Sequence, residues 1–143
     1  MIKVIAGGKK TPWVVEIVEE YQKRMKKPYK IEWQFLAEEK LLKKLENWEF
    51  DKNKEYVVIC DERGEILSSP DFSRKITGVV ENGRDVIILI GGAFGFPSEI
   101  RGKADFLWSF SKLVFPHRLA QAIVAEQVYR AQEIALGRPY HHE

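Results

Sequence analysis

The sequence predicts a single α/β domain with a mainly parallel sheet and helices on both faces of that sheet. Segments patterned like strands alternate with segments patterned like helices along the chain, and two strand segments are continuously apolar, as strands buried on both faces are. The chain has 143 residues, 45% of them hydrophobic. That is enough for one core and short for two ordinary domains, so we expect residues 1–143 to form one domain.

The beginning of the chain predicts a strand followed by a helix. Residues 2–6 are apolar and end at a pair of glycines. Thr11 and Pro12 then offer an N-cap and a proline at the first helical position. Apolar residues recur every three or four positions from there to the turn near Lys27, which predicts an amphipathic helix.

The middle of the chain predicts two further pairs of a strand and a helix. Apolar and polar residues alternate over 31–35, a period of two that is typical of a strand. Residues 38–48 carry a helical apolar stripe, and the apolar run 56–59 indicates a buried strand. A helix over residues 69–82 follows, ended by a glycine.

The last third predicts two strands, each followed by a helix. Residues 86–90 are the most continuously apolar strand, and 97–104 are expected to be helical. A short strand over 106–110 precedes the longest helix, 119–136, which a glycine and a proline end. Ligands of such sheets bind beyond the carboxyl ends of the strands, so the loops after the two buried strands are the first candidates for a site.

Charge and cysteine content exclude several classes of protein. Lys and Arg number 23 and Asp and Glu 21, a balance that does not by itself indicate nucleic-acid binding. Cys60 is the only cysteine, which excludes an internal disulfide, a redox pair and a four-cysteine zinc site, and we expect no metal. No signal peptide and no run of roughly 20 apolar residues is present. We therefore expect a soluble, cytoplasmic protein without a membrane partner.

A glycine-rich turn, Gly91-Gly92-Ala93-Phe94-Gly95, follows the strand at 86–90 directly. Glycines at this place let a ligand or another backbone approach the main chain closely. The turn matches neither the dinucleotide-binding pattern nor the Walker pattern. A tight turn between a strand and a helix explains it equally well.

Polar residues also gather in the loop before the last helix. Ser109, Ser111, Lys112 and His117 are expected at the edge of the sheet where ligands bind. An ordinary loop leading into a helix, with a structural histidine, accounts for them too.

The last helix and the tail carry a second group of polar residues. Glu126, Arg130 and Glu133 share one helix face, where pairing into salt bridges is the simplest account. The tail, residues 138–143, contains an arginine, a tyrosine and two histidines. These side chains are suited to stacking on an unpaired base and binding phosphate, although most chain termini fray without a function.

Missing motifs narrow the reaction class. The chain has no Gly-x-Ser-x-Gly elbow, no His-Glu-x-x-His and no paired aspartates for two-metal chemistry, which disfavours hydrolysis and kinase activity. A reaction whose electrophile comes from a cofactor needs only a backbone pocket, good positioning and at most one group for a proton. Methyl transfer is such a reaction.

The carboxyl-terminal half contains five motifs in order: Leu-Ile-Gly-Gly-Ala-Phe-Gly at 89–95, Ser-Phe-Ser-Lys at 109–112, Phe-Pro-His at 115–117, Ala-Glu-Gln-Val-Tyr-Arg-Ala at 125–131 and Pro-Tyr-His at 139–141. Together they resemble the bacterial pseudouridine methyltransferases of large-subunit ribosomal RNA, in the SPOUT superfamily. The resemblance covers essentially the whole chain and is most specific from Ile90 onward.

The resemblance implies that the carboxyl-terminal part threads a trefoil knot, and that this knot forms a pocket for S-adenosylmethionine (AdoMet). Backbone groups would make most of the contacts with adenine and ribose. Carried over residue by residue, the implied cofactor contacts are Cys60, Gly91, Phe110, Ser111, Lys112, Leu113, Val114 and Phe115.

The resemblance also implies a homodimer, with the last helix in the interface and the tail reaching toward the target base. We expect the apolar face of residues 119–136 to be exposed for this purpose. The implied target is a pseudouridine of large-subunit ribosomal RNA, methylated on ring nitrogen three in assembled ribosomes. The implied catalytic residues, which would position the base and ease its proton away, are Arg130, Tyr140 and His141. Further contacts with the RNA are expected from His117, Arg138 and His142.

Three residues depart from the family pattern. Val114 stands where threonine is common, Gln121 where arginine is common, and His142 where lysine or arginine follows Pro-Tyr-His. These changes bear on which nucleotide is modified rather than on the reaction class. A non-catalytic α/β module that binds a nucleotide or RNA would need the same glycines and is the alternative.

Overall fold

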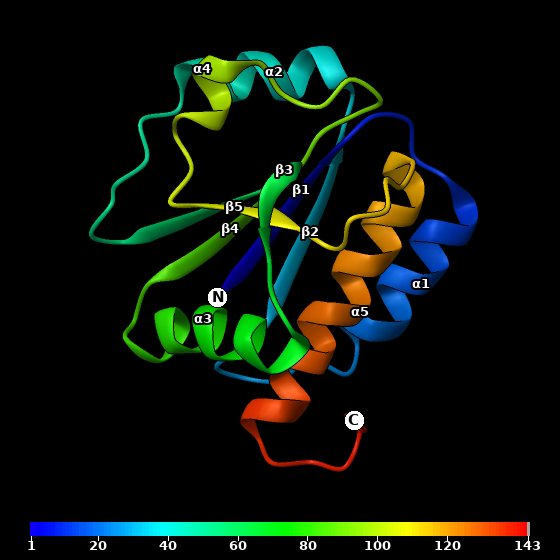
Figure 1. The fold of residues 1–143 in the computed structure, drawn as a ribbon, viewed down its shortest axis with the longest axis vertical. Helices are drawn as coiled ribbons and strands as arrows, with labels where there is room; N and C mark the ends of the chain where they lie inside the picture. Colours follow the sequence, from blue (N-terminus) through cyan, green and yellow to red (C-terminus); the bar gives the residue numbers. More distant parts are fainter. Residues whose placement is uncertain (143) are drawn as a thin grey trace.

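Five parallel strands form a single sheet in the computed structural model, which describes residues 1–142 (Figure 1). Their order across the sheet is β2-β1-β4-β3-β5, so the two strands predicted to be fully buried, β3 and β4, lie inside it. The strands are β1 (Ile2–Gly7), β2 (Ile31–Leu36), β3 (Glu55–Ile66), β4 (Asp85–Ile90) and β5 (Phe106–Ser109).

Helices cover both faces of the sheet, which confirms the predicted α/β class. The helices are α1 (Pro12–Gln22), α2 (Glu38–Asn47), α3 (Ser69–Glu81), α4 (Ser98–Arg101) and α5 (His117–Ala135). One face carries α1, α3 and α5, and the other carries α2 and α4 (Figure 1).

Side chains along β4 point alternately to the two faces of the sheet, so they belong to two separate parts of the core. Val86, Ile88 and Ile90 pack on the side of α3 and α5, whereas Ile87 and Leu89 pack on the side of α2 and α4. All five side chains are at most 2% exposed. Burying each of them contributes about 1.5–3 kcal/mol, which explains why the strand is apolar at every position after Asp85.

Helix α5 lies between α1 and α3, and this placement corrects one expectation. The apolar face of the last helix is not exposed, because Val124 and Val128 are fully buried in the core and Ala125 packs against Val14 and Val18 of α1. Large apolar side chains of this segment are exposed only at its ends, at Leu119 and Leu136, among the described residues. Periodicity identified the apolar face, but two neighbouring helices cover it.

Some helix boundaries differ from the predictions because tertiary contacts replace helical hydrogen bonds. The first helix ends at Gln22 rather than near Lys27, and the backbone N–H of Lys26 donates instead to Oε1 of Gln132 at 2.7 Å. The helix expected over 97–104 shortens to α4 without such a contact, since residues 102 and 103 form a turn in which the backbone N–H of Lys103 donates to the carbonyl oxygen of Ile100 at 3.0 Å.

Strand β3 continues well past the predicted strand at 56–59. Its first part pairs with β5 up to Cys60 opposite Trp108, and the pairing resumes at Glu65, again opposite Trp108. Residues 61–64 are therefore an extra loop, here called the β3 bulge, that bends the strand around β5. Gly64 is required there, because a Cβ atom at this position would lie 2.5 Å from the carbonyl carbon of Leu107.

This contact predicts a marked loss of stability in a Gly64→Ala variant. The new methyl group meets backbone atoms, which cannot rotate away, so we expect the free energy of unfolding to fall by more than about 1 kcal/mol. Gly78→Ala is the matched control, because Gly78 lies within α3 and nothing approaches its Cβ position within 4 Å. The control should gain about 0.4–1 kcal/mol. Urea unfolding of both variants measures the difference, and equal stabilities would contradict the proposed clash.

Candidate active site

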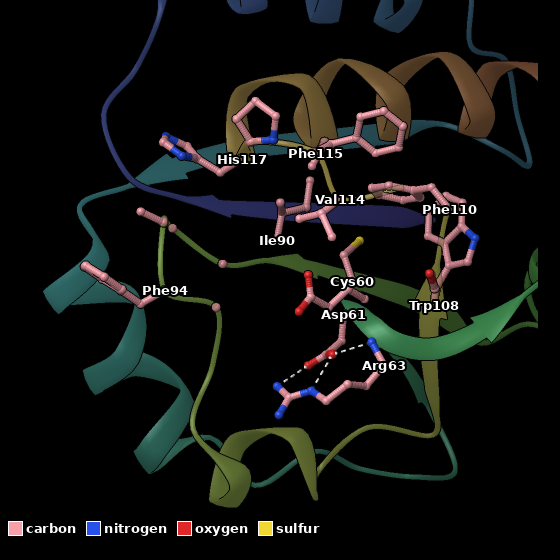
Figure 2. A pocket seen from close by; sticks show the side chains of 18 of the residues that line it. Cys60, Asp61, Arg63, Ile90, Phe94, Trp108, Phe110, Val114, Phe115 and His117 are labelled. Carbon is pink, nitrogen blue, oxygen red and sulfur yellow. Dashed lines mark hydrogen bonds and ion pairs between the residues drawn. The ribbon is translucent and has the colours of Figure 1, made fainter. Parts of the chain in front are cut away.

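A pocket of about 440 Å³ lies at the carboxyl ends of β3, β4 and β5 (Figure 2). Its volume is within the usual range of small-molecule and cofactor sites, about 300–1,000 Å³. Three segments form most of its wall, namely residues 60–63, 90–95 and 108–117. The pocket therefore occupies the edge of the sheet that the sequence indicated.

One side of the pocket is apolar. Figure 2 shows the side chain of Cys60 pointing toward Val114 and Ile90. Burial raises the pKa of the Cys60 thiol, so this group is neutral and acts as part of the apolar wall. Trp108 and Phe110 continue this wall, with ring centroids 4.7 Å apart in an edge-to-face arrangement. The apolar wall is suited to a flat aromatic ring.

The glycine-rich turn after β4 is crowded by neighbouring atoms and also lines the pocket. A Cβ atom at Gly91 would lie 3.0 Å from Cα of Gly95, and one at Gly92 would lie 2.6 Å from Cδ of Glu38. The backbone of Gly95 thus crowds any side chain at Gly91, whereas the flexible carboxylate end of Glu38 could move away from one at Gly92. All three glycines of the turn also line the pocket, so the ligand side of the turn is a main-chain surface.

The loop after β5 is held by two serines. Oγ of Ser109 donates to the carbonyl oxygen of Ser111 at 2.9 Å, and Oγ of Ser111 accepts from the N–H of Leu113 at 2.9 Å. Leu113 and Val114 line the pocket and remain exposed. Of the eight cofactor contacts expected from the sequence, Ser111 and Lys112 are the two whose residues do not line the pocket in the described part of the chain.

His117 begins α5 and also lines the pocket. Its ring lies beside the main chain of Gly8, where a Cβ atom would be 3.4 Å from Nε2 of the histidine. This residue was expected to contact RNA, and the structure places it at the same pocket as the cofactor candidates.

A second group of predicted residues meets on the outer face of α5. Arg130 forms a two-pronged ion pair with Glu126, from Nε to Oε1 and from Nη2 to Oε2, both at 2.9 Å. Nη1 of Arg130 lies 2.9 Å from Nδ1 of His141, and the hydroxyl of Tyr140 lies 3.4 Å from Oε2 of Glu126. The three candidate catalytic residues are therefore together, arranged around one carboxylate. We call Arg130, Tyr140 and His141 the tail site.

The tail site favours a neutral tyrosine. The ring of Tyr140 stands edge-on to Tyr129, with centroids 4.8 Å apart, and the Arg130 guanidinium lies 4.9 Å from the Tyr140 ring centroid. Burial raises the pKa of the Tyr140 hydroxyl, and a hydrogen bond with Tyr21 raises it further. Tyr140 can donate a hydrogen bond at neutral pH, but it is not an ionised base.

The other two tail residues lie apart from this group. Nη1 of Arg138 is paired with Oε2 of Glu133 at 3.0 Å. Glu133 thus pairs with Arg138 rather than with Arg130, while the pairing of Glu126 with Arg130 is confirmed. His142 is exposed.

The pocket and the tail site are separated along α5. Ala120 is the last residue of the helix that lines the pocket, and Arg130 follows ten residues later, about 15 Å along the helix axis. The tail turns back after the end of α5 (Figure 1), which brings His141 to Arg130. Within one chain, the tail site does not reach the pocket.

Sequence reasoning missed the charged residues of the β3 bulge. Asp61, Glu62 and Arg63 all line the pocket. The available signal was an Asp-x-Arg-Gly motif directly after a buried strand, at the end where ligands bind. Within residues 1–142 no helix is long and apolar enough to cross a membrane, and no group of three or more His, Cys, Asp or Glu side chains is placed to hold a metal ion.

The fold and the pocket define a class: a parallel α/β domain whose carboxyl-terminal segments surround a cofactor-sized cavity. A family model described as "Predicted SPOUT methyltransferase" matches residues 1–141. The chain belongs to the SPOUT methyltransferase family.

Known proteins agree with this assignment. The chain is 34% identical, over 98% of both chains, to the ribosomal RNA large subunit methyltransferase H of Desulfitobacterium hafniense strain Y51. Among solved structures, a putative methylase family protein from Neisseria gonorrhoeae has a TM-score of 0.59 at 10% identity, covering 99% of this chain and 85% of that one. The SpoU methyltransferase AviRb from Streptomyces viridochromogenes, solved in complex with AdoMet, has a TM-score of 0.51 at 13% identity. That match covers 93% of this chain and 60% of AviRb. At these identities the two structures show a shared fold.

Proposed function

We propose that this protein transfers a methyl group from AdoMet to large-subunit ribosomal RNA. The pocket at the carboxyl ends of β3, β4 and β5 carries the proposal, because it combines an apolar wall with a main-chain wall at the place where α/β domains bind ligands. The name of the D. hafniense relative, which matches over 98% of both chains, supports the choice of RNA.

The pocket fits AdoMet in size and chemistry. The adenine ring would lie against the apolar side, and backbone groups of Gly91 and of the loop after β5 would bind its polar edge and the ribose. When bound, AdoMet supplies a methyl group that is already activated for transfer. Ser111 and Lys112 would contribute through the backbone of the same loop. The proposed contacts are Cys60, Gly91, Phe110, Ser111, Lys112, Leu113, Val114 and Phe115.

The tail site is the proposed place for the target base, a pseudouridine methylated on ring nitrogen three in assembled ribosomes. That nitrogen must lose a proton, and Arg130, Tyr140 and His141 together are the candidates for positioning the base and easing this proton away. Arg130 orients the histidine through the 2.9 Å contact at Nδ1. Arg138 and His142 extend from the same tail toward the RNA, and His117 would meet the RNA at the pocket.

We further propose that the protein works as a homodimer. The tail site lies about 15 Å from the pocket along α5, so a second subunit is needed to bring a tail to each pocket. The segments after the carboxyl ends of the strands also expose several large apolar side chains, the mark of an interaction surface. These side chains are Trp13, Phe94, Leu113, Val114 and Leu119.

Two further features follow from the family. We propose that the carboxyl-terminal segments forming the pocket, 90–95 and 108–117, are threaded as a trefoil knot; their meeting in one cavity with residues 60–63 supports this. Action on ribosomes would place the protein in the cytoplasm. A non-catalytic binding module is not favoured, because it gives no account of the tail site.

The test is methyl incorporation into ribosomes from a strain that lacks this gene. We expect label from AdoMet to appear in large-subunit RNA, on a pseudouridine identified by mass spectrometry, with free ribosomal RNA as a comparison substrate. Calorimetry should show one AdoMet site per subunit, and AdoMet at a hundred times its Kd should stabilise the fold by about 2.7 kcal/mol. Label only on transfer RNA or protein would contradict the RNA assignment. Binding without transfer to any RNA would favour the non-catalytic module.

A further inference from the structure

The β3 bulge places a fixed arginine at the pocket. The backbone N–H and Nε of Arg63 both donate to Oδ1 of Asp61 at 2.9 Å, and Nη2 donates to Oδ2 at 3.0 Å. Nε of Arg101 lies 3.8 Å from the same Oδ2. The Asp61 side chain is only 6% exposed, whereas that of Arg63 is 61% exposed. Asp61 is therefore a buried anchor, and Arg63 is the group that it presents to the solvent side.

The charges at this point are stable over the working pH range. Burial of Asp61 opposes ionisation, but its hydrogen bonds with Arg63 and the nearby guanidinium of Arg101 outweigh this and lower the pKa of Asp61 below its usual value. Asp61 accepts hydrogen bonds from Nε and Nη2 of Arg63, whereas Nη1 of Arg63 makes no hydrogen bond within the described part of the chain. An anion could bind Arg63 there without breaking its anchor.

The chemistry of the pocket is divided along its length. Ile90, Val114 and Phe115 belong to the apolar part. In Figure 2 the pair of Asp61 and Arg63 lies on the other side of Cys60 from these residues, toward α4. Arg63 is the only lysine or arginine lining the pocket among residues 1–142. The cavity thus offers an apolar end and a charged end, where Arg63 lies beside the carboxylates of Asp61 and Glu62.

AdoMet, like the pocket, has one largely apolar part and one charged part. Its adenosyl part is a flat ring on a sugar, and its methionine part ends in an α-carboxylate and an α-ammonium group. We propose that Arg63, held in place by Asp61, binds the α-carboxylate of the methionine part and so determines specificity for the amino-acid end of the cofactor. This inference rests on the proposed function of the pocket. Charge-assisted hydrogen bonds from arginine to a carboxylate are among the stronger polar contacts in proteins.

The test compares ligands that do and do not carry the amino-acid end. For Arg63→Gln, we expect affinity for AdoMet and for S-adenosylhomocysteine to fall about tenfold or more. Affinity for 5′-methylthioadenosine, which lacks the amino acid, should stay within about twofold of that of the unaltered chain. Arg74→Gln is the matched control, because Arg74 is also an exposed arginine paired with an aspartate, Asp71, but lies on α3 away from the pocket. It should leave all three affinities unchanged.

Other results would overturn the assignment in distinguishable ways. An equal loss for AdoMet and methylthioadenosine would show that Arg63 only supports the pocket wall. Unchanged AdoMet affinity with a raised KM for ribosomes and a shallower salt dependence would show that Arg63 binds RNA phosphate. If the unaltered chain bound none of the three ligands, the proposed function itself would fail along with this inference.

Discussion

Removing residues 140–143 is expected to lower methyl transfer to ribosomes at least about a hundredfold while leaving AdoMet affinity within about twofold. The deletion removes Tyr140 and His141 from the tail site, together with Glu143, which lies outside the described residues. Base stacking on an aromatic ring is worth about 1–3 kcal/mol, and misplacing a reacting group costs about a further hundredfold in rate. No residue of this segment lines the pocket in the described part of the chain, so cofactor binding should survive.

Initial rates with saturating ribosomes, and calorimetry with AdoMet alone, measure the two effects separately. Tyr140→Phe is a conservative comparison, because it keeps the ring against Tyr129 and loses only the hydroxyl contacts with Glu126 and Tyr21. It should retain most of the activity, whereas Tyr140→Ala should not. Normal turnover after the deletion would show that the tail does not position the base.

The sheet was predictable because the pattern of apolar residues in each strand indicates which of its faces are buried. A strand that is apolar at every position must be buried on both faces, and this property of β4 and of the first part of β3 follows from their sequences alone. The extension of β3 was not predictable, because Asp61-Glu62-Arg63-Gly64 has neither alternation nor β-forming residues. Its course depends on a contact with Leu107 and Trp108, which lie more than forty residues away in the chain.

The candidate site was likewise predictable only in part. The rule that ligands bind beyond the carboxyl ends of parallel strands located the glycine-rich turn and the loop after β5. It could not show that Asp61 anchors Arg63, since spacing alone does not say which charges meet. Periodicity likewise identified the apolar face of α5, but it could not say that α1 and α3 cover this face. The surface of the proposed dimer is therefore expected at the exposed apolar side chains beside the pocket.

Mixing two inactive variants is expected to restore about a quarter of the normal activity if the tail of one subunit serves the pocket of the other. The first variant, Gly91→Val, would disable the pocket, because a Cβ atom there would already lie 3.0 Å from Cα of Gly95 and the exposed turn would shift. The second variant is the chain without residues 140–143. In a heterodimer, the intact pocket of the second chain meets the intact tail of the first, which gives one working site of two. Random pairing makes half of the dimers heterodimers, since closed dimers are symmetric and both chains share one interface.

The two chains should be co-expressed with different tags, and the doubly tagged dimers should be purified before ribosome methylation is measured. Purified heterodimers should then reach about half of the normal activity, because one of their two sites is complete. Each variant alone, mixed with itself in the same way, provides the background. A heterodimer as inactive as either parent would place the whole site within one chain. Because the tail site lies about 15 Å from the pocket along α5, that result would require the tail to leave Glu126 and move along its own helix toward the pocket. Arg130→Lys, by removing the guanidinium contacts with His141 and the Tyr140 ring, should then favour this rearrangement.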